Sequence, residues 1–253
     1  MQRIAALLCS LGLTLSGAAQ AACEDPGQGI DEQSFVPING IEQWVTIKGE
    51  RCANPVVLMV HGGPGNPLTP FAHKLFGAWE KEFTIVHWDQ RGSGMTYSRK
   101  PIAKLEALGA PPWTNPRAFG IARRIDRKVE AQVTDPAPKS WWQPAPQYTT
   151  ARYEADYTAG EDYSFLHFVG YKGDGMFSRY DLYRMGTRFA LPVYFVMGQE
   201  DLLPSPQVAR RYFDAIEAPA KDFIVVPRAG HDPNQPMMTA QLQVLRRAAA
   251  AAR

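Results

Sequence analysis

Apolar and polar positions alternate along the chain in patterns that predict a mixed α/β domain. Four mostly apolar runs of strand length lie at 56–60, 83–88, 193–198 and 223–226. Helical spacing of apolar residues occurs at 71–79, 207–217 and 236–250. The run at 56–60 contains no polar residue, which is typical of a strand that is buried on both faces.

A hairpin is expected before these strands. Residues 34–38 and 44–47 alternate in polarity on either side of the Asn-Gly pair at 39–40, which favours a two-residue turn. Further along, the helix at 207–217 is expected to turn one apolar side towards the core. The residues that we expect it to bury are Val208, Tyr212, Phe213 and Ile216.

The middle of the chain has a different character. Short helical patterns at 102–108 and 119–133 lead into a proline-rich segment at 135–147 and an aromatic-rich segment at 148–183. Such a stretch between core strands is typical of a lid over a pocket. The predicted segments are a leader at 1–22, an N-terminal core part at 23–100, a cap at 101–190 and a C-terminal core part at 191–253.

The leader has the pattern of a secretory signal. Arg3 precedes an apolar stretch at 4–15, and an Ala-Gln-Ala sequence at 19–21 suits signal cleavage. We therefore expect an exported protein, periplasmic or secreted, with no stable membrane insertion, because the stretch is too short to span a bilayer. The formal net charge of +2 gives no electrostatic reason to expect a nucleic-acid partner.

Two cysteines remain once the leader is removed. Cys23 and Cys52 both flank the first strands and would lie in an oxidising compartment, so we expect a structural disulfide. Two thiols without supporting histidines make a poor zinc site, and no metal is expected.

Glycines follow the first apolar run at a position suited to chemistry. The strand at 56–60 ends in His-Gly-Gly-Pro-Gly, and the strand at 83–88 ends in Asp-Gln-Arg-Gly. Because glycine has no Cβ, the backbone N–H groups of Gly62 and Gly63 could approach a developing oxyanion closely. We interpret His61 as a hydrogen-bonding loop residue rather than a general base.

An acid and a base follow the two C-terminal strands. The run at 193–198 leads into Asp201, and the run at 223–226 leads into His231. Their separation fits one strand–helix–strand step, which would place both residues at the same edge of a parallel sheet. In acyl transfer the histidine would accept the nucleophile's proton and the aspartate would fix the imidazole's tautomer.

The two glycine-containing motifs together resemble the prolyl aminopeptidase (proline iminopeptidase) family of α/β-hydrolases. The resemblance covers roughly 37–98 and 101 to the C-terminus. It implies an α/β-hydrolase fold with a helical cap, release of an N-terminal residue, often proline, from peptides, and no metal or organic cofactor. It also implies Asp201 as acid, His231 as base, and cap carboxylates that recognise the free amine. The candidates for that last role are Glu154, Glu161 and Asp162.

The chain departs from this family at the nucleophile. No G-x-S-x-G sequence occurs, and residue 100 leads directly to 101 where the family would place at least two strand–helix units, roughly 60 residues. Ser93 lies between two glycines but lacks the context of a nucleophile elbow. Loss of central strands would leave unpaired edges and exposed apolar faces, so either the C-terminal strands close up against 56–60 or the product is unstable.

The residues leave the present state of the chain open. It is either an exported serine hydrolase that is inactive or impaired, or a non-catalytic pseudo-hydrolase that binds a small ligand or peptide. An esterase or amidase of the same fold, acting on a small ester or amide, is the nearest alternative activity. An internal deletion without a working product fits the sequence equally.

Overall fold

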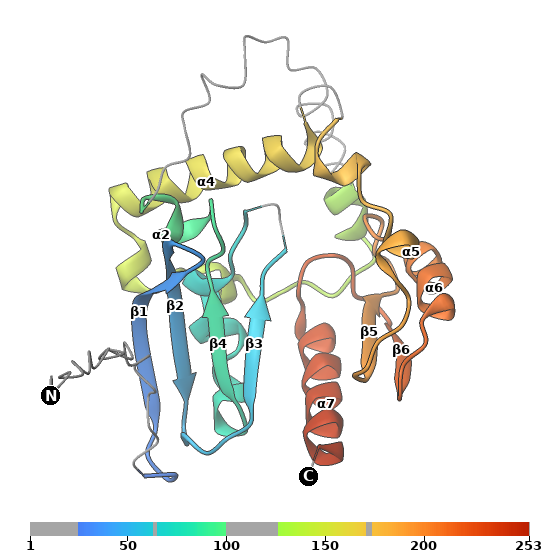
Figure 1. Ribbon diagram of the computed structural model, residues 1–253, viewed down its shortest axis with the longest axis horizontal. Coiled ribbons are helices and arrows are strands. Elements are labelled where there is room, and N and C mark those ends of the chain that lie inside the picture. The colour runs from blue at the N-terminus through green and yellow to red at the C-terminus, as the bar shows by residue number, and fades with distance from the viewer. Residues whose placement is uncertain (1–24, 63–64, 100–125, 171–173, 253) are drawn as a thin grey trace, which may run out of the picture.

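The described strands form two sheets. The computed structural model describes residues 25–62, 65–99, 126–170 and 174–252. The first sheet has the order β1-β2-β4-β3 (Figure 1). Its strands are β1 (Ile30–Ile38), β2 (Ile41–Gly49), β3 (Val56–Val60) and β4 (Thr84–Trp88).

The hairpin expected at 39–40 is confirmed, and its strands are longer than predicted. β1 and β2 pair antiparallel from Ile38–Ile41 outward to Ile30–Gly49. Asn39 and Gly40 both have positive φ, 51° and 74°, as the two-residue turn requires. β2 pairs antiparallel with β4, and β4 pairs parallel with β3.

The second sheet is a single strand–helix–strand unit. β5 (Val193–Gly198) and β6 (Lys221–Val226) pair in parallel, and α6 (Pro206–Ala215) connects them. Ser205 caps α6 by accepting a hydrogen bond from the Val208 backbone N–H. Phe213 and Ile216 are buried as expected and Tyr212 is half-buried. Val208 is 54% exposed, so its predicted burial is wrong, because the described chain covers only part of that side of the helix.

The two sheets do not join, and β3 has an uncovered face. β3 pairs only with β4 among the described strands. Val57 and Met59 pack against the core, but Val56, Leu58 and Val60 are 67%, 54% and 58% exposed. The prediction that this strand is buried on both faces is therefore wrong. A central strand needs a neighbour on each edge and a layer on each face, and the described chain supplies only one of each.

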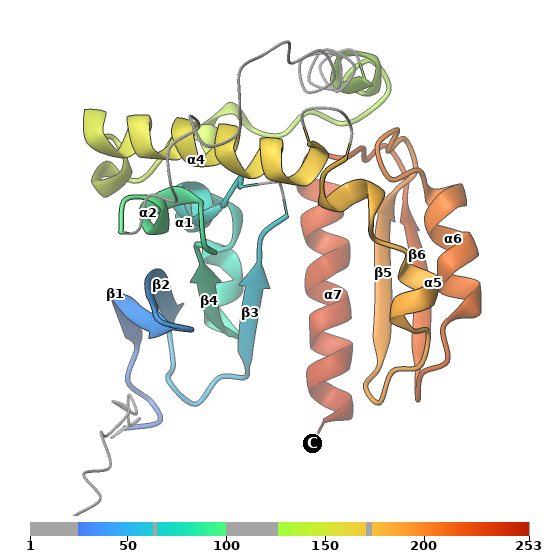
Figure 2. The same cartoon turned by 45° about the horizontal axis from the view of Figure 1, so that its top comes forward.

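Helix α7 (Gln235–Ala251) lies between β3 and β5 (Figures 1 and 2). Its Met238 joins the core of the first sheet, which is formed by Leu75, Phe76, Trp79, Phe83 and Ile85. Its Met237 joins a second, smaller core with Val226 and Ala229 under the second sheet. One helix thus contributes to both cores, and it connects two sheets that share no strand pairing.

The helix expected at 71–79 is broken. Its parts are η1 (Thr69–Phe71), α1 (Ala72–Leu75) and η2 (Gly77–Lys81). Gly77 weakens an α-helix here. The tighter turn lets Phe76 and Trp79 both bury, with ring centroids 5.1 Å apart.

A long helix covers the carboxyl ends of β3 and β4. α4 (Ala151–Val169) runs across the top of Figure 1, above α2 (Gly94–Tyr97). Thr150 caps its start, and Gly170, with φ of 79°, ends it. The remaining short elements are η4 (Lys139–Trp142), η5 (Pro146–Tyr148), η6 (Met176–Ser178) and α5 (Leu182–Met185).

Several predictions fall partly outside the described residues. The leader at 1–22, Cys23 and the helical piece at 102–108 lie outside them, and of 119–133 only residues from 126 onward are described, with 126–130 helical. Cys52 is disulfide-bonded. Where the chain is described, no helix is both long and apolar enough to cross a membrane.

Candidate active site

Asp201 and His231 lie in contact where the second sheet ends. His231 Nδ1 is 3.2 Å from Asp201 Oδ2, and Asp201 Oδ1 accepts a hydrogen bond of 2.9 Å from the Leu203 N–H. Asp201 is buried, whereas about a third of the His231 side chain is exposed. With Nδ1 directed at the carboxylate, the proton resides on Nδ1 and Nε2 is the nitrogen able to accept another.

The two loops that carry this pair cross at close range. The Glu200 N–H donates to the Ala229 carbonyl over 3.0 Å. A Cβ on Gly198 would lie 2.4 Å from the same carbonyl oxygen, so this strand end requires glycine. The close crossing brings the residues after β5 and β6 together.

Glu130 connects the same two loops, and the sequence interpretation missed it. Its Oε1 accepts a 2.8 Å hydrogen bond from the Leu202 N–H, and its Oε2 accepts one of 3.0 Å from the His231 N–H. The residue is 95% buried. Its only signal in the sequence was a carboxylate on an amphipathic helix, a pattern that far more often marks a solvated face.

The loop after β3 is braced by His61, as expected for a loop residue. Gln90 donates from its backbone N–H to His61 Nε2 (3.2 Å) and from its side chain to the His61 carbonyl (2.8 Å). His61 Nδ1 lies 2.8 Å from the Gly62 carbonyl. Burial lowers the pKa of His61, which favours the neutral ring. Of the two predicted oxyanion donors, Gly62 is exposed on this loop and Gly63 lies outside the described residues.

The turn after β4 is organised by a fully buried carboxylate. Asp89 accepts hydrogen bonds from the Thr69 hydroxyl and, at 2.9 Å, from the Met95 N–H. Burial raises its pKa to about 6, against the smaller opposing effect of these hydrogen bonds. Gly94, with φ of 46°, leaves room for it, since a Cβ there would lie 2.2 Å from Oδ2.

A cavity of about 380 Å³ lies between the loop after β3, the turn after β4 and α4. Ser93 lines it but is only 1% exposed. Its hydroxyl lies 2.7 Å from the Gln90 carbonyl, to which it can donate, and 3.1 Å from His61 Nε2. Ser93 is therefore tied to the brace around His61. Within the described ranges, no hydroxyl or thiol is hydrogen-bonded to His231 Nε2.

The candidate amine-binding carboxylates Glu154, Glu161 and Asp162 all lie exposed on α4. Burial and, next, the nearby Glu161 carboxylate raise the pKa of Tyr157, whose hydroxyl donates to Asn66. Glu161 is thus near the loop that follows β3. Among the described residues, no cluster of three potential metal ligands occurs.

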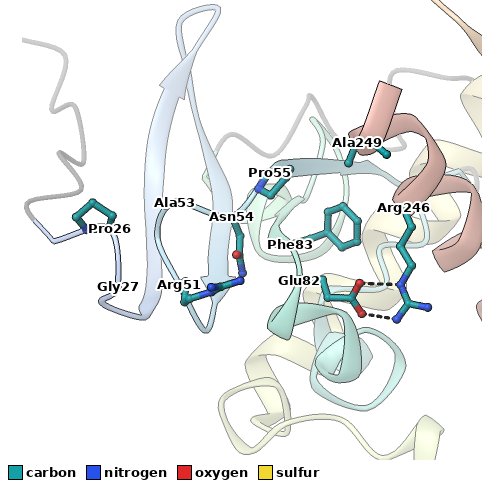
Figure 3. Close-up of a pocket in the computed structure, with 11 residues that line it drawn as sticks. Pro26, Gly27, Arg51, Ala53, Asn54, Pro55, Glu82, Phe83, Arg246 and Ala249 are labelled. Carbon is teal, nitrogen blue, oxygen red and sulfur yellow. Dashed lines mark hydrogen bonds and ion pairs between the residues drawn. The ribbon is translucent and has the colours of Figure 1, made fainter. Parts of the chain in front are cut away.

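A second hollow, of about 580 Å³, lies at the amino-terminal ends of β3 and β4 (Figure 3). It is lined by Pro55, Phe83 and the end of α7. At its rim, Arg246 of α7 forms a two-point ion pair with Glu82, one bond being 2.7 Å. Arg246 lowers the pKa of Glu82. This hollow is at the opposite end of β3 from His61, so we do not connect it with the Asp201–His231 pair.

We compared the chain with known protein families and with curated proteins. No protein-family profile matches the chain. A stretch of 63 residues is 43% identical to the Bacillus subtilis protein named probable aminopeptidase YbaC, covering 25% of this chain and 20% of that protein. The chain thus spans about a fifth of the length of that curated relative.

Several solved structures resemble most of the chain. A proline iminopeptidase from Mycobacterium smegmatis matches with a TM-score of 0.51 at 16% identity, covering 88% of this chain and 100% of that one. A variant of an epoxide hydrolase from Vigna radiata matches with a TM-score of 0.50 at 15% identity, covering 87% and 99%. Likeness at this level of identity is evidence of fold alone. The chain has an α/β-hydrolase fold that is truncated by the loss of its central strand–helix units.

Proposed function

We propose that this chain is a serine-hydrolase relative of the prolyl aminopeptidases, with an assembled acid–base pair and no nucleophile. The single observation that carries the proposal is the 3.2 Å contact between His231 Nδ1 and the buried Asp201 carboxylate. That contact occurs in an α/β-hydrolase fold, after the strands where such a fold carries its acid and base. The activity of its lineage would be release of an N-terminal residue, often proline, from peptides.

The other site residues take roles that agree with this chemistry. Gly62 and Gly63 would supply backbone donors to the oxyanion. Glu154 and Glu161, on the helix that covers the carboxyl ends of β3 and β4, would receive the free amine of a peptide. The same site would serve an esterase or amidase acting on small substrates, if a different group than an amine were recognised there.

Turnover by serine chemistry should be absent. A general base must lie within hydrogen-bond reach of the nucleophile that it activates. Ser93 is buried and bonded around His61 instead. Loss of a nucleophilic serine alone costs about 10⁶-fold in turnover, and the oxyanion donor that follows the serine is lost with it.

A second candidate is a pseudo-hydrolase that binds a small ligand or peptide without cleaving it. The observation that favours it is the cavity of about 380 Å³ below α4, whose volume falls within the range of roughly 300–1,000 Å³ for small-molecule sites. A binding function of this kind requires the cavity but no nucleophile.

Export is part of the proposal. The pattern of the first 22 residues supports it, and so does the disulfide at Cys52, since disulfides persist mainly in oxidising compartments. We further propose that Cys23 is the partner of Cys52. Peptide mapping under non-reducing conditions would identify the partner, and cell fractionation would locate the chain.

Fluorophosphonate labelling of the purified, leader-free protein tests the absence of a nucleophile. We expect no adduct by intact mass on a protein whose circular dichroism is that of a folded α/β chain, and no hydrolysis of a proline arylamide. A stoichiometric adduct that disappears in Ser93→Ala would contradict the proposal and identify the substitute. Calorimetry with proline amide on the same sample separates the candidates, because only the binding protein gives a saturable signal without product.

A further inference from the structure

We propose that Glu130 is a positioning residue that holds the Asp201 loop and the His231 loop in register with one buried carboxylate. This inference rests on the proposed acid–base role of Asp201 and His231. Glu130 is the last residue of the helical turn at 126–130, within the predicted cap segment. Its two partners are 72 and 101 residues further along the chain.

The geometry uses each carboxylate oxygen once. Oε1 accepts from the N–H of Leu202, the residue directly after the acid, over 2.8 Å. Oε2 accepts from the N–H of His231, the base itself, over 3.0 Å. Hydrogen bonds to an ionised carboxylate are among the stronger ones in proteins, and burial strengthens them further. Glu130 therefore restrains the backbone of both residues from outside the pair.

Only a carboxylate satisfies both contacts. The two partners are backbone donors, so the bridging group must accept at both of its atoms. A glutamine in the same rotamer could accept at one atom only, and its NH₂ group would face the other N–H. The space is also matched to this side chain, because a Cβ on Gly230 would lie 2.5 Å from Glu130 Oε2.

Other contacts keep the segment docked when Glu130 is changed. The Asp135 N–H donates to the Arg228 carbonyl over 2.8 Å. The Asn234 side chain donates to the Asp135 carbonyl over 3.0 Å. Arg127 and Asp232 form an ion pair at 3.1 Å. A variant at position 130 should therefore lose the two restraints without releasing residues 126–135 from the loop that carries His231.

The test compares Glu130→Gln and Glu130→Ala with the leader-free wild type by NMR. The readouts are hydrogen exchange at the Leu202 and His231 amides and the low-field signal of the His231 Nδ1–H. In Glu130→Gln we expect exchange at one amide to rise about tenfold or more, and in Glu130→Ala at both, with weakening of the Nδ1–H signal. Glu32→Gln is the matched control, since Glu32 is an exposed carboxylate on β1.

The outcomes separate this inference from the proposed function. If both amides and the Nδ1–H signal are unchanged in folded Glu130→Gln and Glu130→Ala, Glu130 does not position the pair. If Glu130→Ala does not fold, the near-isosteric Glu130→Gln decides the matter alone. The proposed acid–base pair predicts a His231 Nδ1–H signal in the wild type that disappears in Asp201→Asn. If the wild type shows no such signal, or if the signal persists in Asp201→Asn, the proposed pair is wrong, whatever the role of Glu130.

Discussion

Two buried ionisable residues of β4 and its following turn respond to pH in opposite directions. Burial lowers the pKa of His87 from 6.5 to about 4 and raises that of Asp89 from 3.8 to about 6. Between pH 4 and 6 the folded state binds fewer protons at His87 than the unfolded state, so this residue makes stability rise with pH. At Asp89 the folded state binds more protons, so this residue makes stability fall. Each effect corresponds to roughly 3 kcal/mol, and the two largely cancel.

Replacing either residue alone should reveal the pH dependence of stability that the two residues cancel in the wild type. Relative to His87→Gln, the wild type should gain roughly 3 kcal/mol in the free energy of unfolding from pH 4 to 6.5. Relative to Asp89→Asn, the wild type should lose roughly 3 kcal/mol in the free energy of unfolding from pH 4 to 6. The hydrogen bond that the variant loses changes its stability by a similar amount at each pH, so it does not affect this difference. Urea unfolding across this range measures both differences, and curves that stay parallel to the wild type would contradict the two buried-charge assignments.

Gly198 is where the crossing of the two site loops should be most sensitive. Gly198→Ala places a methyl group against the backbone carbonyl of Ala229, so we expect a loss of about 1–3 kcal/mol in stability and a weaker His231 Nδ1–H signal. Gly77→Ala is the control, because open space surrounds that position and the loss of glycine entropy is favourable. Equal effects of the two substitutions on the imidazole signal would count against a close crossing.

At the scale of elements, α7 is the only helix among the described ones that enters both cores. Met238 packs against Phe76 and Trp79 below the first sheet, and Met237 packs against Val226 below the second. The ion pair between Arg246 and Glu82 adds a surface contact to the first sheet, but exposed pairs of this kind contribute little. Apolar packing on α7 should therefore decide whether the two sheets unfold together.

Shortening a core side chain on one side of α7 should allow the two sheets to unfold separately. Met238→Ala is expected to cost about 2–5 kcal/mol, and hydrogen exchange should then rise in β1–β4 ahead of β5 and β6. Gln243→Ala, on the exposed side of the same helix, should leave exchange unchanged. If Met238→Ala raises exchange equally in all six strands, the two sheets form one cooperative unit.

Local sequence patterns predicted most of the strands and helices. The errors concern side-chain burial and hydrogen bonds, which depend on residues far away in the sequence. The Asn39–Gly40 turn and the parallel pairing of β5 with β6 follow from short-range signals. The exposure of Leu58 could not be inferred from an apolar run, because its burial depends on a layer packed against that face of the sheet, which the described part of the chain does not supply. Glu130 was missed because its two hydrogen bonds join residues 72 and 101 positions away.

For the whole molecule, the uncovered side of β3 is a liability. Val56, Leu58 and Val60 form an apolar row on a strand that lacks a partner on one edge among the described strands. Unpaired, apolar edges promote association between copies of a chain. We expect the purified protein to self-associate as its concentration rises.

Leu58→Lys should reduce that association. A charge in the middle of the apolar row blocks edge pairing, so sedimentation velocity should shift towards the monomer. Val208→Lys is a matched control, since Val208 is 54% exposed, as Leu58 is, but lies on α6 rather than on a sheet edge. If both substitutions reduce association equally, net charge and not the strand edge is the cause.

The position of α7 also determines when the fold can be completed. β3 and β4 are synthesised early, but Met238, which belongs to their core, is made only after all the described strands. At about 5–20 residues per second, roughly 10–40 s separate synthesis of β3 from that of the end of α7. During this interval the core of the first sheet lacks the helix that supplies Met238 to it. The yield of the protein in the cell should therefore depend on holdase chaperones acting on the nascent chain.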